Sequence, residues 1–140
     1  MNKKPRRRKL GDVYAIPLLN GKYGFGRIFH DASIAVYTHT GTSIQDLPPT
    51  EDYQFIVGVY NSTLKSRNWE VVDNRPFNNE EDKWPPPACI LDCISGEYSI
   101  YHKGEIRPSS ETDCIGLETA AVWEAEHIVD RIMGDDKWHK

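Results

Sequence analysis

The thiols are the first residues in this sequence whose chemistry has to be assessed. Cys89 and Cys93 stand four residues apart in a stretch expected to be a strand, with Cys114 further along the chain. A four-residue step along a strand spans about 13 Å, which is too far for a disulfide or a shared zinc ion unless the strand bends. We therefore expect half-buried thiols. An odd number of cysteines without a recognisable secretion signal favours their reduced form in a cytoplasm.

Histidines and carboxylates are the second set of candidates. Glu124 and His127 have the E-x-x-H spacing of a di-iron helix, but such a site needs a second helix of this kind and further carboxylates. The spacing of His102 and His127 from nearby acidic residues defines no catalytic dyad. The sequence lacks a G-x-S-x-G elbow, a P-loop and an H-E-x-x-H motif. We therefore expect no catalytic residue, no metal, no cofactor and no enzymatic activity.

The stretch NRPFNNEEDKWPPP, residues 74–87, is the best candidate for binding a partner. Its proline, asparagine and acidic residues are typical of a long exposed loop. Glu80, Glu81 and Asp82 would steer a basic partner. Trp84 would anchor that partner, because tryptophan is enriched among the residues that dominate binding energies. The alternative is a solvated loop whose Trp84 folds back onto the domain.

Charge is distributed unevenly along the chain. The sequence has 17 basic and 21 acidic residues, and six of the basic ones lie within residues 3–9. The other 11 basic residues stand against all 21 acidic ones, so the body carries a net charge of −10. An acidic body repels nucleic acid and favours a basic partner. Residues 1–9 are expected to be a flexible basic leader, and no stretch approaches the roughly 18 apolar residues of a membrane span.

KYGFGRIF, residues 22–29, has the character of a strand but contains two glycines. Alternation places Gly24 and Gly26 on one face and larger side chains on the other. A bare face lets a side chain or backbone pack directly on the strand, or lets the sheet bend, and we favour this interpretation. The alternative is a flat aromatic platform for a base or another ligand. The larger side chains are those of Tyr23, Phe25, Arg27 and Phe29.

Two-residue periodicity predicts the other strands. Residues 12–18 and 22–29 should form a hairpin, because Asn20-Gly21 between apolar runs is typical of a type I′ turn. The longest apolar run, residues 53–60, predicts a central strand. The remaining predicted strands are residues 33–38, 68–73, 88–94 and 97–104, with a tight connection or single helical turn at 61–67 and an end to the strand pattern near Ile106.

A change of period predicts one helix over residues 116–133. Glu118 near its start and Arg131 near its end suit the helix dipole, and Gly134 is typical of the residue after a helix. The apolar stripe of this helix would be formed by Leu117, Ala121, Val122, Ala125, Ile128, Val129 and Ile132.

Trp123, His127 and Asp130 lie on the opposite side of this predicted helix. A tryptophan on a polar face is either covered by another part of the chain or exposed as an anchor for a partner. We favour the covered arrangement, in which residues 74–87 would provide the cover.

These elements predict a mainly β (α+β) fold in a single globular domain, residues 10–134, between the leader and a short tail at 135–140. We expect a strongly bent antiparallel sheet, or a partly open small barrel, of five to seven strands. One C-terminal helix would pack on that sheet.

The motifs described so far resemble the immunity protein twenty-six family of bacterial polymorphic toxin systems. Family members are similar in their order of motifs: a G-D-V-aromatic-A-I-P-L strand, a Y-G-F-G-R strand, a W-x-V strand, a Pro-rich segment and a closing A-A-V-W-x-A-E-H-x-x-D-R segment. In this sequence the corresponding positions are Gly11 to Leu18, Tyr23 to Arg27, Trp69 to Val71, Trp84 to Pro87 and Ala120 to Arg131.

The resemblance implies a cytoplasmic bacterial protein that neutralises a cognate toxin by direct stoichiometric binding and has no catalytic activity. It supplies no motif for the toxin-contacting residues. The acidic body suggests that the toxin is basic, as a nuclease with a basic cleft would be. The competing hypothesis is a small β-barrel that binds nucleic acid through Tyr23, Phe25 and Arg27, although the charge of the body disfavours it.

Overall fold

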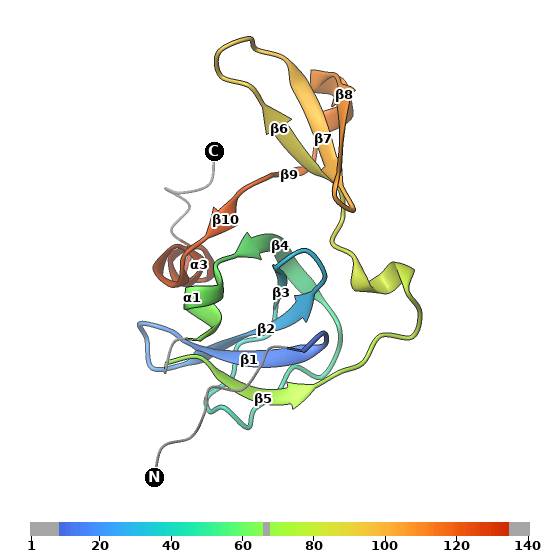
Figure 1. Ribbon diagram of the computed structural model, residues 1–140. Coiled ribbons are helices and arrows are strands. Elements are labelled where there is room, and N and C mark those ends of the chain that lie inside the picture. The colour runs from blue at the N-terminus through green and yellow to red at the C-terminus, as the bar shows by residue number, and fades with distance from the viewer. Residues whose placement is uncertain (1–8, 66–67, 135–140) are drawn as a thin grey trace.

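The computed structural model describes residues 9–65 and 68–134, which form two β-sheets (Figure 1). The predicted leader and tail lie outside the described residues, apart from Lys9. In chain order the elements are β1 (Asp12–Pro17), β2 (Tyr23–Phe29), β3 (Ser33–Tyr37), β4 (Tyr53–Val59), α1 (Asn61–Leu64), β5 (Glu70–Asn74), the 3-10 helix η1 (Glu81–Lys83), β6 (Ala88–Leu91), β7 (Tyr98–His102), β8 (Glu105–Ser109), α2 (Glu111–Cys114), β9 (Glu118–Thr119), β10 (Val122–Trp123) and α3 (Ala125–Ile132).

The larger sheet has six strands in the order β10-β4-β3-β2-β1-β5. Strands β1 to β4 pair antiparallel with their neighbours in the chain, and β5 adds to the other side of β1. Register shifts beside Val13 and Val36 interrupt the ladders, and such bulges bend and twist a sheet. The mostly β fold is therefore confirmed, but β4 lies next to the edge strand β10 rather than at the centre, and neither sheet closes into a barrel.

The hairpin of β1 and β2 forms as predicted, but its turn is of another type. Gly21 has a φ of 80°, whereas Asn20 does not take the positive φ that a type I′ turn requires. The amide of Gly21 donates to the carbonyl of Leu18 at 3.3 Å, and the amide of Leu18 donates to that of Lys22 at 2.9 Å. This is a type I turn followed by a glycine bulge.

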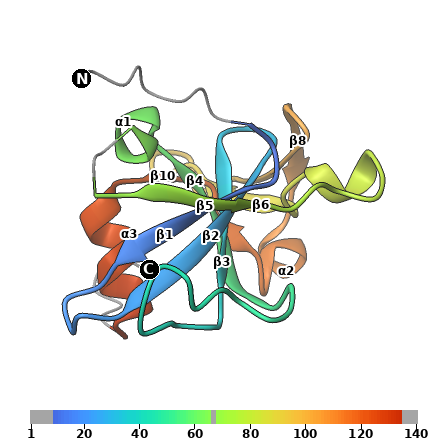
Figure 2. The same ribbon diagram turned by 90° about the horizontal axis from the view of Figure 1, so that it is seen from below.

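The two glycines of β2 are places where other side chains pack directly on the strand. A Cβ atom at Gly26 would lie 2.6 Å from Cγ1 of Ile34, which is on the adjacent strand β3. A Cβ atom at Gly24 would lie 3.1 Å from Cδ1 of Ile132 in α3. The interpretation of the glycines as a close-packing site is confirmed. Figure 2 shows α3 running alongside β1 and β2.

The opposite face of β2 is not an open platform. Phe25 is fully buried, and Arg27 and Phe29 are each 7% exposed. Phe25 belongs to a second core cluster with Val13 and other residues, which includes side chains from the connection between β3 and β4. The aromatic-platform alternative is therefore wrong, because the rings that would stack on a ligand are already packed inside the protein.

The C-terminal helix is shorter than predicted. α3 begins at Ala125, and residues 118–123 are extended: β9 pairs in parallel with β6, and β10 pairs in parallel with β4. Glu118 is thus not in the first turn of the helix, although Arg131 is in its last turn and Gly134 ends it with a φ of 90°. Tertiary pairing overrides the helical preference of the Glu-Thr-Ala-Ala stretch.

The smaller sheet has the order β8-β7-β6-β9 and stands apart from the larger one (Figure 1). The predicted turn at Ser95-Gly96 joins β6 to β7, and Gly96 has a φ of 75°. The strand pattern does not end near Ile106, because β8 continues to Ser109 and β9 and β10 follow. One extended segment, residues 118–123, therefore forms an edge of both sheets.

The core lies almost entirely in the larger sheet. One cluster lies between that sheet and α3, and it includes Ile16, Ile34, Val59, Trp123 and Ile128. Within residues 88–121, by contrast, Cys114 is the one fully buried residue. In the described part of the chain, no helix is long and apolar enough to cross a membrane.

Candidate partner-binding surfaces

A polar cluster under the larger sheet fixes the start of the loop that carries the predicted contact residues. Nη1 of Arg27 donates to Glu51 at 3.2 Å and to the hydroxyl of Tyr53 at 3.0 Å. The carboxylate of Glu51 also accepts from the hydroxyl of Tyr37 at 2.7 Å and from Nη1 of Arg75 at 2.6 Å. Arg27 of the Y-G-F-G-R motif, predicted to be a structural residue, thus holds this cluster together through partners that the sequence pattern did not reveal.

This cluster shifts the titration of its members. Partial burial alone would raise the pKa of Glu51, but hydrogen bonds from Tyr37, Tyr53 and Arg75 hold it below its ordinary value of 4.5. Burial, followed by the hydrogen bond to Glu51, raises the pKa of Tyr37. Glu51 therefore stays ionised and Tyr37 stays neutral, which are the charge states that this cluster of hydrogen bonds needs.

Phe77, near the start of the loop 74–87, packs on aromatic and cationic groups beside this cluster. The Phe77 ring lies edge-on to Phe29 with centroids 5.0 Å apart. The guanidinium of Arg27 lies 3.8 Å from the centroid of the Phe77 ring. Such contacts are worth on the order of 1 kcal/mol each, so the first part of the loop is held against the domain.

Two of the three predicted contact acids have basic neighbours within the chain. Glu80 accepts from Nζ of Lys83 at 2.9 Å, and Glu81 pairs with Nζ of Lys103 at 2.5 Å. These acids are mostly exposed, so their ion pairs contribute little to stability. Asp82 is also exposed, and its backbone amide donates a hydrogen bond to Oδ1 of Asn79 at 3.0 Å.

Trp84 packs back onto the domain. Its ring lies 4.6 Å from that of His30, between centroids, and the residue is half-buried. The amide of His30 donates to the carbonyl of Lys83 at 2.8 Å, which fixes the loop at the same point. This is the geometry of the solvated-loop alternative, and it leaves one side of the loop, with the three acids, facing solvent.

Trp123 is buried as expected, but by different neighbours. It lies in β10 rather than on a helix, and it is 7% exposed. The ring centroids of Phe55 and Trp123 are 6.4 Å apart, and the guanidinium of Arg131 lies 5.3 Å from the ring centroid of Trp123. The prediction that residues 74–87 cover it is wrong. His127 and Asp130 are half-buried on α3 and do not continue a stripe from Trp123.

The three cysteines differ in exposure. Cys114 is buried, Cys89 is half-buried and Cys93 is exposed, and all three are free thiols. Sγ of Cys114 lies 3.8 Å from the carbonyl oxygen of Ser99. Burial, with a smaller effect of the neighbouring Cys89, raises the pKa of Cys114 to about 11. Cys114 is therefore a protonated, weakly reactive thiol at neutral pH. The proximity of Cys89 and Cys114 has no signal in the sequence.

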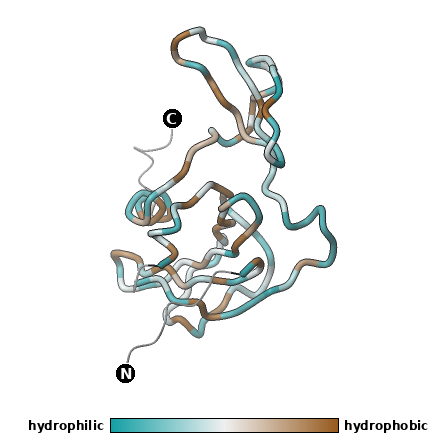
Figure 3. The backbone as a smooth tube through the Cα atoms, in the orientation of Figure 1, coloured by the Kyte–Doolittle hydropathy of each residue, from teal (hydrophilic) through white to brown (hydrophobic). Residues whose placement is uncertain are grey.

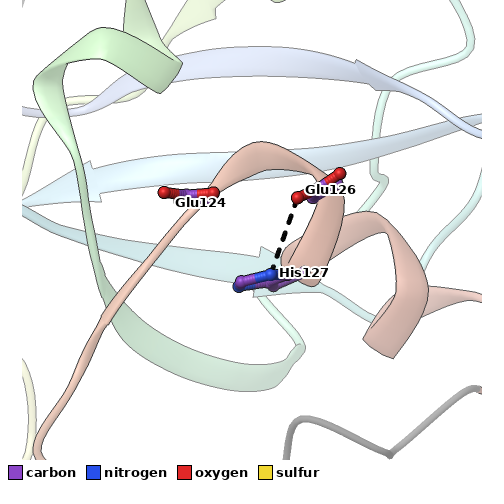
Figure 4. Close-up of side chains that lie close together, drawn as sticks. All are labelled: Glu124, Glu126 and His127. Atoms are coloured by element: carbon purple, nitrogen blue, oxygen red, sulfur yellow. Dashed lines mark ion pairs between the residues drawn. The ribbon is translucent and has the colours of Figure 1, made fainter.

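One group of potential metal ligands occurs in the described residues, at the start of α3 (Figure 4). Ligand atoms of Glu124, Glu126 and His127 lie within 4.8 Å of one another, and Nε2 of His127 lies 3.7 Å from Oε1 of Glu126. Both glutamates are exposed. The positive end of the helix dipole opposes a cation here, so the geometry assigns no metal.

The smaller sheet and the turns beside it expose apolar side chains. The exposed fraction is 97% for Ile94, 76% for Ile115, 63% for Ile106 and 51% for Leu91. Figure 3 shows this hydrophobic colouring along β6 and the turn that follows. The register places Leu91 and Ile106 on opposite faces of the sheet, so both faces present apolar side chains to solvent.

These features define a mostly β protein whose polar clusters hold its loops in place and whose smaller sheet is apolar and open. The family model for Immunity protein 26 matches residues 9–100, which is well over half of the chain, and the chain belongs to that family. The match spans β1 to β6, with the loop between β5 and β6, and ends within β7. No curated protein and no solved structure matches the chain. Family membership implies an immunity protein, whose partner is a cognate toxin.

Proposed function

We propose that this protein neutralises a cognate toxin by direct stoichiometric binding in the bacterial cytoplasm, as one half of a polymorphic toxin system. Family membership is the observation that carries the proposal. The net charge of −10 outside the basic leader supports a basic toxin, such as a nuclease, whose substrate-binding cleft an acidic surface would occupy. The mechanism requires no turnover and no cofactor.

Glu80, Glu81, Asp82 and Trp84 form the candidate contact segment. The side chains of Glu80 and Glu81 are 73% and 77% exposed, so they can form ion pairs with a basic partner although Lys83 and Lys103 lie beside them. Trp84 is only half-buried against His30, so part of its ring is available to a partner. If Trp84 anchors the toxin, Trp84→Ala should speed dissociation and cost about 2 kcal/mol of binding free energy.

The direct test uses the toxin encoded by the neighbouring gene. Cells that produce this toxin should grow only when the immunity protein is also made. Titration of the purified toxin should show complete inhibition at a one-to-one ratio. Complete protection by a substoichiometric amount, with the toxin chemically altered afterwards, would show that the mechanism is enzymatic instead.

A further inference from the structure

The smaller sheet has one face that its own elements leave uncovered. Antiparallel partners place side chains from β6, β7 and β8 in two rows on this face. Five of the six residues are apolar or aromatic, and Ile106 is 63% exposed. We call this surface the inner face, and its residues are Ala88, Ile90, Ser99, Tyr101, Ile106 and Pro108.

A groove lies between the inner face and the larger sheet. Its cavity of about 300 Å³ is lined by Ala88, Ile90 and Tyr101 on one side and by Ile56 and Gly58 of β4 on the other. The volume suits one large apolar side chain, and such pockets receive the anchor residues of protein partners. The other apolar walls are Pro85, Pro86, Pro87, Ala120, Ala121 and Val122.

The groove is held open by contacts between its walls. Tyr101 on β7 and Asp31, in the turn between β2 and β3, both line the groove, and the neighbouring carboxyl of Asp31 raises the pKa of the Tyr101 hydroxyl. The segment 118–123 pairs with β6 at one end and with β4 at the other. The two sheets are therefore fixed relative to each other, and the groove between them is formed before a partner binds.

Charge identifies the kind of partner that fits. Residues 80–121, which contain the smaller sheet and most of the groove walls, hold nine acidic and three basic residues. Residues 10–79 hold seven acidic and five basic residues. The excess acid thus lies in the part of the chain that forms the smaller sheet, with Asp31 and Glu118 lining the groove itself, and it complements a basic surface.

We infer that the groove and the inner face are the docking site of the cognate toxin, which inserts a large apolar side chain flanked by basic residues. The inference rests on the proposed function and extends it to a surface beyond the acidic loop. Pro85, Pro86 and Pro87 join the two, because they follow Trp84 directly and form one wall of the groove.

The test compares two exposed apolar residues at opposite ends of the protein. Ile106 is on the inner face, whereas Leu19, which is 80% exposed, is in the turn between β1 and β2. The probe is the toxin encoded by the neighbouring gene, released from the co-produced complex. Ile106→Asp should raise the dissociation constant about tenfold or more, whereas Leu19→Asp should change it less than about twofold.

A second variant tests the cavity itself. Ala121→Phe narrows the groove and should also weaken binding about tenfold, with a thermal unfolding midpoint near that of the unmodified protein. If Ala121→Phe proves unstable, the milder Val122→Ala, at a position that lines the groove and is 53% exposed, replaces it. Binding to the unmodified protein should weaken as salt concentration rises, because the partner is basic.

The outcomes separate this inference from the proposed function. If the toxin binds the unmodified protein and all groove variants equally well, the docking site is wrong and the immunity function stands. If the toxin fails to bind the unmodified protein, the proposed function fails and the inference fails with it. A dimer of this chain that Ile106→Asp disrupts, with toxin binding unchanged, would assign the inner face to self-association and overturn the inference.

Discussion

The two sheets of this protein differ in how far their side chains are buried: most of those of the larger sheet are buried, and those of the smaller sheet are half-buried or exposed. β1 to β4 of the larger sheet supply most of the core, and α3 and the connection between β3 and β4 cover its two faces. Among residues 88–121, which contain the smaller sheet, the one buried residue is Cys114 of α2. Because burial of apolar area is the main source of stability, the larger sheet determines folding, and the smaller one is free to present a surface.

The largest expected effect contrasts one isoleucine from each sheet. Ile34 is fully buried between β2 and β4, whereas Ile94 is 97% exposed in the turn after β6. Ile34→Ala should lower the free energy of unfolding by about 2–5 kcal/mol, and Ile94→Ala should change it by less than about 0.5 kcal/mol. Chemical denaturation measures both, and equal losses would show that the smaller sheet shares the core.

The glycines of β2 give the next largest effect. Gly26→Val would force its side chain against Ile34 and should cost roughly 1–3 kcal/mol of stability through overpacking. Gly24→Ala should cost less, because the nearest atom is Cδ1 of Ile132 at 3.1 Å, at the end of a flexible side chain. Thermal unfolding ranks the two variants. Unchanged stability of Gly26→Val with lost toxin binding would contradict the packing role.

The stability of the larger sheet should also depend on pH through Glu51. Its pKa is lower in the folded protein than its ordinary value of 4.5. Its contribution is therefore complete above the unfolded pKa and is lost as pH falls through the folded pKa. Glu51→Gln should flatten the acid limb of the stability curve below about pH 5. An acid limb of unchanged steepness would show that other carboxylates cause it.

The smallest expected effect on stability comes from the acidic loop. Changing Glu80, Glu81 and Asp82 together to Gln, Gln and Asn should leave unfolding within about 0.5 kcal/mol of the unmodified protein, because all three are exposed. Association with the toxin should become slower and less sensitive to salt. Stopped-flow measurements at several salt concentrations detect this. If the triple variant associates with the toxin as fast as the unmodified protein does, at every salt concentration, this loop does not steer association.

The strands of the larger sheet were predictable because each has one or two buried faces, which gives its sequence either an alternating or a continuous run of apolar residues. Tyr23–Phe29 and Tyr53–Val59 agree with their predicted spans to within one residue. The stretch 116–124 was wrongly predicted as helix. Its leucine, alanines and glutamate fit a helical period, and only the distant strands β4 and β6 draw it into the sheets.

The contact surfaces were less predictable than the fold. The sequence located the acidic loop, because charge and proline are local signals. It did not reveal the groove, whose walls come from residues 31–58 and 85–122. Nor did it reveal that Arg27 binds Glu51, 24 residues away. Such contacts depend on how the sheets are placed, which no short-range pattern encodes.

The parallel pairing of β10 with β4 also has a consequence for synthesis on the ribosome. While residues 118–132 are still being made, β4 has a bare edge and the glycine face of β2 lacks the helix that covers it. The nascent chain thus exposes an aggregation-prone edge and an apolar surface until residues 118–132 have left the ribosome. Because β10 and α3 complete the larger sheet and its core, active protein should arise only after these two elements have been made.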